Sequence, residues 1–400
     1  MNMFVLFLIW RVLGLIVAFI ADKIVPSSGM FQLFIKPIDL GFQLPNFIQD
    51  SANFDGINYL HIAKYGYGLY QQAFFPLFPF LIKIVSVVTN NNYFIAGILI
   101  SNLSFLIGIF VFKKYLESIG KKPKEIVWIF IFLLTFPTAF FFGAVYTESL
   151  FFLLSVLALY FMQKRKYWIV LVVCMLAALT RLIGVFLLIP LFFTVIIQQQ
   201  QLHSFWKSGN LCYANLKHLI FVHGKAIALM TAPILGLLIY MFYLAYAVRN
   251  PFAFYSTQSN FHAGRSASSL IFLPQVYYRY LNIFIHAQHN LIYFVAILEF
   301  LIFNLVLVVL LYDLWILWKR KDIVNRISLI GLNIFSLINI LLPTLTGTLS
   351  SVPRYTLLSL SFFIRLAEFK NKVVRSALVI LFVTLFVILF VLFTQGYFVS

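Results

Sequence analysis

The sequence has few charged residues. Asp, Glu, Lys and Arg together make up 10% of the chain, whereas hydrophobic residues make up 63% and the mean hydropathy is +0.99. Soluble domains are typically about one quarter charged and less than half apolar. A chain of this composition lacks the polar residues needed to cover a water-facing surface, so the composition excludes a soluble globular protein.

Cysteines and local sequence motifs are also scarce. The two cysteines, Cys174 and Cys212, are too few for a disulfide framework and have no neighbours at metal-ligand spacing. We find no internal repeat, no glycine-rich phosphate loop, no Walker motif and no long Ser/Pro-rich linker. We therefore expect one membrane domain over residues 1–400, with no soluble nucleotide-sugar module, no metal site and no bound cofactor.

Long apolar segments, by contrast, are abundant. Residues 93–112, 226–248 and 377–394 each reach the length of about 18 apolar residues that crosses a bilayer. The segment from Phe4 to Ile20 is apolar like a signal peptide, but the chain continues through Asp22 and Lys23 without a small-residue cleavage site. We interpret this segment as a retained first span.

The basic residues indicate the topology. The formal net charge is +18, and 19 of the 29 Lys and Arg residues lie in five short clusters between apolar runs, at 113–124, 164–166, 207–225, 319–326 and 365–375. Basic residues arranged in this way, and not along one soluble face, argue against a nucleic-acid partner. By the positive-inside rule, the five clusters are expected in the cytoplasm.

One arrangement of spans satisfies this rule, with the N-terminus inside. It has eleven spans, at 3–21, 93–112, 126–145, 149–163, 167–180, 183–198, 226–248, 290–318, 326–346, 354–367 and 375–396. Residues 22–92 and 249–289 then form two large outer loops. The segment 73–88 is apolar, but Pro76 and Pro79 interrupt it and it contains Lys83, so we predict a helix lying in the outer interface. The fold class is thus an all-α integral membrane protein.

The acidic residues indicate where chemistry takes place. There are only eleven, and each costs about 2.5–3.5 kcal/mol at a bilayer centre. Several lie in basic cytoplasmic loops, where they act as charge partners. The others of interest collect on the predicted outer side, namely Asp22, Asp39, Asp50, Asp55 and Glu148. Carboxylates above a membrane-embedded bundle are suited to removing a proton from a polar acceptor.

Five sequence blocks occur in an order that matches a known family. They are the run from Phe54-Asp55-Gly56 through Tyr59 to Phe78-Pro79; Phe136-Pro137 with Tyr146-Thr147-Glu148-Ser149; Leu179-Thr180-Arg181 with Gly184; Asn250-Pro251-Phe252 with Gln258; and Pro353-Arg354-Tyr355. Together they resemble the PIG-V type mannosyltransferases, which are GT-C fold enzymes related to the second mannosyltransferase of GPI-anchor synthesis. The similarity extends over nearly the whole chain.

The resemblance implies a fold and a reaction. It implies a GT-C-like bundle of about eleven transmembrane helices, whose first outer loop contains short interfacial helices. It also implies inverting transfer of a hexose, which in this family is mannose, from a polyprenyl-phosphate donor such as dolichyl-phosphate mannose to a lipid or glycan acceptor at the membrane. Metal is not generally required in this class. The main departure is Phe54, where the family usually has Trp; it changes a packing ring and leaves the acid in place.

Asp55 and Glu148 are the candidate catalytic residues. Asp55 begins a predicted short helix, where an Asp is also common simply as a cap for free N–H groups. The corresponding acid in GT-C enzymes is the expected general base, and an inverting displacement needs one base and no enzyme nucleophile. Glu148 lies at a tight outer turn, where it either stabilises the next helix N-terminus or binds acceptor hydroxyls and assists Asp55.

Arg354 and Arg181 are the candidate donor-phosphate ligands. Arg354 follows Pro353 at the predicted outer mouth of a span, and Arg181 is placed at the outer end of its helix. A guanidinium in such a position either extends to lipid headgroups or binds a phosphate in a bidentate manner and stabilises it as it leaves. We expect phosphate binding for both, with Arg354 the principal ligand.

The remaining candidates contact sugar or acceptor. They are Tyr59 in the first block and Gln258, His262 and Arg265 in the second outer loop. The last three lie among aromatic residues, which are common at membrane interfaces without any ligand. The alternative is a lid in which rings cover the apolar face of the sugar while amide, imidazole or guanidinium groups bind its hydroxyls.

Two other classes of function share the general features. A lipid-linked-sugar flippase or other polytopic transporter is also helical and basic, but transporters usually have repeats and broken helices with polar residues near the midplane. A noncatalytic subunit of a glycan-assembly complex is the other alternative, and the presence of Asp55 argues against it. We expect a multi-pass protein of a prokaryotic plasma membrane with its site facing outward, or of the endoplasmic reticulum membrane if the source is eukaryotic.

Overall fold

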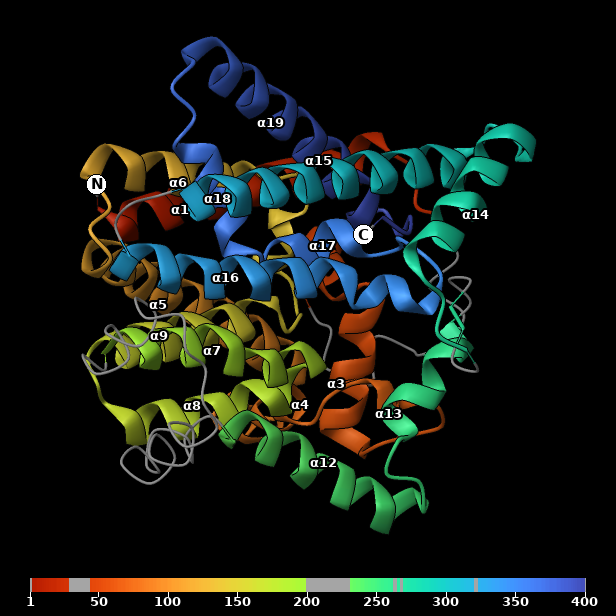
Figure 1. Ribbon diagram of the computed structural model, residues 1–400. Coiled ribbons are helices and arrows are strands. Elements are labelled where there is room, and N and C mark those ends of the chain that lie inside the picture. The colour runs from red at the N-terminus through yellow and green to blue at the C-terminus, as the bar shows by residue number, and fades with distance from the viewer. Residues whose placement is uncertain are drawn as a thin grey trace.

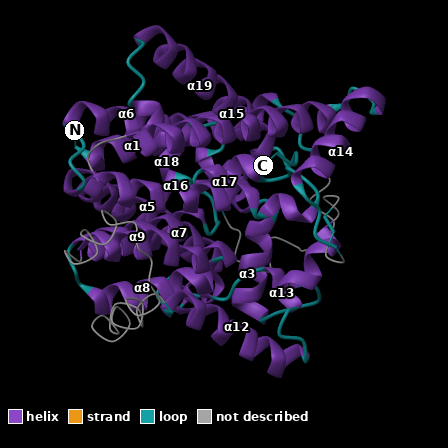
Figure 2. Cartoon of the chain, viewed as in Figure 1, coloured by secondary structure: helices purple, strands orange, loops and turns teal. Residues whose placement is uncertain are grey.

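The computed structural model describes residues 2–28, 44–198, 231–261, 265–266, 269–319 and 323–399. Over these residues the chain forms α- and 3-10 helices and no β-strand (Figures 1 and 2). The expected all-α fold is therefore confirmed for the described part of the chain.

The first half of the chain places a set of short helices between two groups of longer ones. In order, these elements are α1 (Met3–Ile24), α2 (Asn46–Gln49), η2 (Asp50–Ala52), α3 (Asp55–Tyr65), η3 (Gln71–Ala73), α4 (Leu77–Ser86), α5 (Tyr93–Ser118), α6 (Pro123–Thr135), η4 (Ala139–Gly143), α7 (Glu148–Gln163), α8 (Tyr167–Thr180), η5 (Leu182–Leu187) and α9 (Leu188–Gln198). The short helices expected within residues 22–92 are thus present, including α4 in the apolar segment 73–88.

The second half of the chain also contains both long and short helices. They are α12 (Ala232–Val248), α13 (Ala253–Ser256), η6 (Thr257–Phe261), α14 (Leu273–His286), α15 (Leu291–Lys319), α16 (Ile323–Leu341), η7 (Pro343–Thr346), α17 (Val352–Thr356), α18 (Leu360–Ala367) and α19 (Lys372–Thr394). The predicted outer loop 249–289 therefore contains three helices.

Several helices have the length and composition of membrane spans. Among the described residues, five helices are long and apolar enough to cross a bilayer: Met3–Ile24, Tyr93–Ser118, Leu291–Lys319, Arg326–Thr346 and Lys372–Thr394. Ala232–Val248 becomes a sixth when it is joined to Ala253–Asn260, although the two pieces are bent by 82°. Other expected spans coincide with shorter apolar helices, such as Glu148–Gln163 and Tyr167–Thr180. These features are those of a helical membrane protein, whereas the number of eleven spans stays a prediction.

The longer helices lie side by side as a bundle, and α3, α13 and α14 gather toward one end of it (Figure 1). Within the bundle α5 packs along α7. Gly108 of α5 permits this approach, because a Cβ at that position would lie only 2.7 Å from the ring of Phe152. Small residues at such contacts are typical of helix pairs in membranes, where close packing replaces the hydrophobic effect.

Basic clusters lie together in two pairs at the opposite end (Figure 1). Lys121, in the turn after α5, forms an ion pair of 2.5 Å with Glu368 after α18, which joins the cluster at 113–124 to that at 365–375. Gln163, at the end of α7, donates a hydrogen bond of 3.4 Å to Ser328 in the first turns of α16, next to the clusters at 164–166 and 319–326. The cluster at 207–225 lies outside the described residues.

The chain departs from its expected spans at Pro137. Residues 126–145 were expected as one helix, but α6 ends at Thr135 and Phe136 adopts an extended conformation with ψ of 141°. Proline has no N–H to donate, and it disfavours helical geometry in the residue before it. The following residues form the short helix η4, whose Phe142 carbonyl accepts a hydrogen bond from the Ser149 hydroxyl at 2.5 Å.

The expected span 354–367 is also interrupted. It consists of α17 and α18, separated by an irregular segment over 357–359. Asn339 of α16 stabilises this break, because its amide donates to the Tyr355 carbonyl at 2.6 Å and to the Ser359 hydroxyl at 3.0 Å. Irregular backbone at membrane depth is tolerated where neighbouring protein groups satisfy its hydrogen bonds in this way.

Candidate active site

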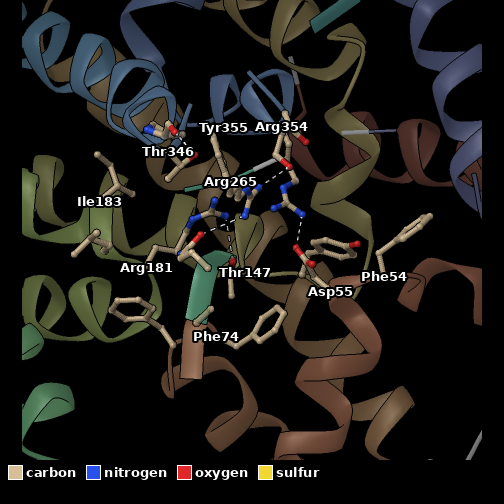
Figure 3. Close-up of a pocket in the computed structure, with 18 of the residues that line it drawn as sticks. Phe54, Asp55, Phe74, Thr147, Arg181, Ile183, Arg265, Thr346, Arg354 and Tyr355 are labelled. Carbon is tan, nitrogen blue, oxygen red and sulfur yellow. Dashed lines mark hydrogen bonds and ion pairs between the residues drawn. The ribbon is translucent and has the colours of Figure 1, made fainter. Parts of the chain in front are cut away.

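Asp55 is the first residue of α3. The preceding residue, Phe54, has φ of 62° and ψ of −115°, a conformation that is unfavourable for a side chain of this size. Its ring packs 5.8 Å from the ring of Phe393 and 5.4 Å from that of Phe398, which holds this turn in place. Asp55 Oδ2 accepts a hydrogen bond of 2.6 Å from Arg354 Nη1 (Figure 3). The carboxylate is therefore an ion-pair partner of Arg354, and the N-cap position of α3 is occupied by Phe54 and not by Asp55.

Arg354 lies on the one-turn helix α17, nearly 300 residues after its partner. Its guanidinium lies 5.3–5.4 Å from the ring centres of Phe141, Tyr146 and Tyr355. Such contacts stabilise a cation that has been removed from water. The Arg354 side chain is 9% exposed, so its charge is held in a fixed position between aromatic rings.

Glu148 is the first residue of α7 and lies behind the arginines. Its Oε1 accepts a hydrogen bond of 2.6 Å from Arg181 Nη1 and lies 3.3 Å from Arg354 Nε. The side chain is only 1% exposed, and Glu148 does not line the cavity described below. In this geometry Glu148 contacts two guanidinium groups, and its expected contact with an acceptor hydroxyl stays a prediction.

Arg181 follows the last residue of α8. It adopts an extended conformation with φ of −157° and ψ of 147°, which turns its side chain across the end of α7. Besides Glu148, its Nη1 donates to the Thr147 hydroxyl at 3.1 Å, and its guanidinium lies 5.0 Å from the ring centre of Tyr355. Arg181 and Arg354 are thereby held on the same buried carboxylate and against the same tyrosine.

Arg265 approaches from the second predicted outer loop. Its Nη1 donates to Gln258 Oε1 at 3.3 Å, and its Nη2 donates to the Ser351 hydroxyl at 3.4 Å. Among the described residues, no carboxylate lies within salt-bridge distance of Arg265, in contrast to the other two arginines. Its charge is consequently the one least neutralised by direct contact.

These side chains surround a cavity of about 730 Å³. Its polar wall contains Arg181, Arg265 and Arg354, and its apolar wall is formed largely by aromatic residues, among them Phe54, Phe74, Phe75, Phe141, Tyr146, Tyr255 and Phe398. Asp55 is the one carboxylate among the described residues that line it. A cavity of this size, largely apolar with a few converging charged groups, is typical of a small-molecule site.

Most of the predicted site residues come together here. Asp55, Tyr59, Arg181, Gln258, Arg265 and Arg354 line the cavity, and Glu148 lies directly behind it. Tyr59 is 7% exposed, and burial followed by the negative charge of Asp55 raises the pKa of its hydroxyl, so it stays protonated. His262 lies outside the described residues.

Sequence reasoning missed several polar residues of this region. Ser351 and Thr147 bind the arginines, and Asn339 lines the cavity. Glu299, a buried acid near the start of α15, was given no role. Polar residues inside otherwise apolar helices are rare, so Asn339 and Glu299 carried a signal. Thr147 lies in one of the matching sequence blocks but was given no role, and Ser351 lies just before another.

Among the described residues, no group of three or more His, Cys, Asp or Glu side chains is placed to hold a metal ion.

The comparisons with known proteins do not assign a family to the chain. Comparison of the chain with family models, with curated proteins and with solved structures finds no match.

Proposed function

We propose that this protein is a membrane glycosyltransferase. It transfers a hexose, mannose by the family resemblance, from a polyprenyl-phosphate donor to a lipid or glycan acceptor at the membrane. The observation that carries the proposal is the cavity in which one carboxylate, Asp55, faces three arginines. One base and a cationic surface for a leaving phosphate are the groups that an inverting transfer from a phosphate-linked sugar requires.

The proposed reaction has one displacement step. Asp55 accepts the proton of the acceptor hydroxyl, whose oxygen bonds to the anomeric carbon of the sugar. The bond from that carbon to the phosphate oxygen breaks on the opposite face, and the electron pair leaves with polyprenyl phosphate. The arginines stabilise the phosphate as its negative charge increases, because fixed charges in a site that excludes water act more strongly than in solution.

The three arginines are proposed to act differently. Arg181 and Arg354 both contact Glu148, and Arg354 also contacts Asp55. Arg265 has only the neutral partners Gln258 and Ser351 among the described residues. We therefore assign the main phosphate contact to Arg265, while Arg354 bridges base and phosphate. The aromatic wall and Tyr59 are left to contact the sugar and acceptor.

The proposal includes a topology. Eleven spans in a GT-C-like bundle, with the N-terminus in the cytoplasm, place the cavity on the outer face. The two pairs of basic clusters at the end opposite the cavity support this orientation, because such clusters are retained in the cytoplasm. Single cysteines at Lys121 and at Ser259, labelled in intact cells with an impermeant maleimide, test it; labelling of Ser259→Cys alone is expected, and the reverse result overturns the orientation.

The activity is tested with radiolabelled polyprenyl-phosphate mannose and purified protein, using membrane extract as the source of acceptor. Wild type, Asp55→Asn and the control Asp22→Asn are compared. Asp22 is an exposed acid of the same region that does not line the cavity. We expect transfer by wild type and Asp22→Asn, and donor binding without transfer by Asp55→Asn.

Other outcomes separate the alternatives. Equal activity of all three proteins removes Asp55 as the base. If wild type transfers no label from any polyprenyl-phosphate sugar, the enzyme assignment fails, and the same protein in vesicles is assayed for movement of the labelled donor across the bilayer. Movement of the labelled donor across the bilayer would identify a flippase. If the donor does not move, a noncatalytic subunit of a glycan-assembly complex is the remaining alternative.

A further inference from the structure

Glu299 is a buried acid that the proposed reaction does not use. It lies in α15, a candidate membrane span of 29 residues, and is 4% exposed. An acidic side chain at membrane depth is costly and is found there with specific partners. Its partners therefore indicate why it is present.

Those partners are a tyrosine of α14 and the loop that leads into α17. Glu299 Oε2 accepts a hydrogen bond of 2.9 Å from the Tyr280 hydroxyl, and its carboxylate also accepts one from the backbone N–H of Ser351. The Tyr280 oxygen in turn accepts a hydrogen bond of 3.0 Å from the Leu349 N–H. Burial and the charge of Glu299 raise the pKa of the Tyr280 hydroxyl, so that it remains a donor. One carboxylate thus holds both ends of the segment from Leu349 to Ser351.

This segment is held in a conformation that it would not favour by itself. Ser351 has φ of 67°, in the left-handed region that a residue with a side chain rarely adopts. Such conformations persist where surrounding contacts fix them. The hydrogen bond to Glu299 and the bond of Arg279 Nη1 to the Gly347 carbonyl at 3.2 Å supply contacts of this kind.

The segment connects Glu299 to two arginines of the cavity. The Ser351 hydroxyl accepts the hydrogen bond from Arg265 Nη2, and the negative charge of Glu299 also acts on Arg265. Three residues later, α17 carries Arg354. Ser350 and Ser351 line the cavity, whereas Glu299 does not. Displacing the segment would therefore move Arg265 and Arg354 in the polar wall of the cavity, although neither side chain would be lost.

We propose that Glu299 is a positioning residue that, through Tyr280 and the segment from Leu349 to Ser351, holds Arg265 and Arg354 in the arrangement that receives a lipid-linked phosphate. This inference rests on the proposed function for the identity of the ligand. Its structural part, that Glu299 fixes the segment, is independent of the reaction.

The first test compares donor kinetics. Glu299→Gln keeps the size of the side chain and removes its charge, and Tyr280→Phe is the milder second variant in case the first folds poorly. Each is expected to raise the KM for polyprenyl-phosphate mannose about tenfold, with a much smaller change in kcat, because a charged hydrogen-bond partner of the segment is lost. Asp313→Asn is the matched control, since Asp313 is also a buried acid of α15 but bonds to Arg365, away from the cavity. Unchanged KM in both variants overturns the inference even if the enzyme assignment stands.

The second test needs no donor. Ser350→Cys is introduced together with Cys174→Ala and Cys212→Ser, and its rate of reaction with an impermeant maleimide is measured. Ser350 is 8% exposed, so slow labelling is expected, with at least a severalfold increase when Glu299→Gln or Tyr280→Phe is added and none with Asp313→Asn. If wild type neither binds nor turns over any polyprenyl-phosphate sugar, the proposed function fails and this measurement alone decides: faster labelling supports the positioning role, and an unchanged rate overturns it.

Discussion

The two ends of the bundle each contain a buried group of charges, and the groups differ in what they face. The cavity cluster consists of Asp55, Glu148, Arg181, Arg265 and Arg354. The closed cluster, at the end with the basic turns, consists of Lys121, Asp313, Asn333, Arg365 and Glu368. In the closed cluster Arg365 donates to Asp313 at 2.6 Å and to Glu368 at 2.6 Å, and none of its members lines the cavity.

The charges of the closed cluster are more completely paired and more deeply buried than those of the cavity cluster. Arg365 and Asp313 are 6% and 7% exposed, and Asn333 satisfies the second oxygen of Asp313 at 2.7 Å. Asp55 is 30% exposed in its ion pair, and Arg265 has only neutral partners among the described residues. A network whose charges are paired away from any cavity joins helices, whereas one that borders a cavity and leaves a charge with only neutral partners is available to a ligand.

The largest expected difference between the clusters is in catalysis. Asp55→Asn should lower kcat for label transfer by about 10²- to 10⁴-fold, the usual contribution of a general base. Asp313→Asn should leave kcat of the folded protein unchanged. The folded fraction of each variant is measured by size-exclusion chromatography in detergent. If both variants lower kcat equally at the same folded fraction, the proposed difference between the two clusters is wrong.

Stability should show the opposite order. Asp313→Ala leaves Arg365 buried without its nearest carboxylate, and loss of one partner of a buried ion pair costs about 3–5 kcal/mol. Asp55→Ala should cost much less, because the Asp55 side chain is 30% exposed and water screens its ion pair. Thermal unfolding of the two variants in the same detergent provides the measurement, and a greater loss for Asp55→Ala contradicts the distinction.

Within the cavity cluster, the arginines should differ in donor binding. Arg265→Gln should raise donor KM about tenfold, the effect of losing one charge-assisted hydrogen bond. Arg181→Gln should raise it less, because Arg181 is already paired with Glu148 at 2.6 Å. Steady-state kinetics with varied donor separates the two. Equal changes in KM would remove the distinction between paired and unpaired arginines.

A half-buried acid outside both clusters should give the smallest effect. Burial, and then the charge of Asp22, raises the pKa of Asp50 from 3.8 to about 7. Since the folded pKa is above the unfolded one, the folded state holds the proton more tightly, and stability falls as pH rises from about 4 to 7 and stays reduced above it. Asp50→Asn should therefore raise the melting temperature more at pH 8 than at pH 5. An equal shift at both pH values would show that Asp50 is not destabilised by its charge.

Much of the fold was accessible from the sequence because membrane helices have a direct compositional signal. The long runs at α1, α5, α15 and α19 were placed to within a few residues. The break after Thr135 was missed although Pro137 marks it, since the apolar run continues past the proline. The break before α18 depends on Asn339 from another helix, and no local pattern reveals a hydrogen bond between segments 16 residues apart.

The site was predictable to a different extent. Asp55, Arg181 and Arg354 were identified by sequence blocks, and the structure brings all three to one cavity. The sequence did not indicate that Glu148 lies behind the arginines, because the depth of a side chain depends on how α7 and α8 pack. Glu299 was passed over for the same reason: its partners come from α14 and from the segment before α17.

The division of residues 352–367 into α17 and α18 has a consequence for how the protein is made. Helices of 5 and 8 residues are far shorter than the about 20 apolar residues that cross a bilayer, and the amide of Asn339 in α16 binds the Tyr355 carbonyl and the Ser359 hydroxyl on either side of the break. We therefore expect this stretch to enter the membrane stably only together with α16. Because Arg354 is carried on the same stretch, its place in the cavity wall depends on that joint insertion as well.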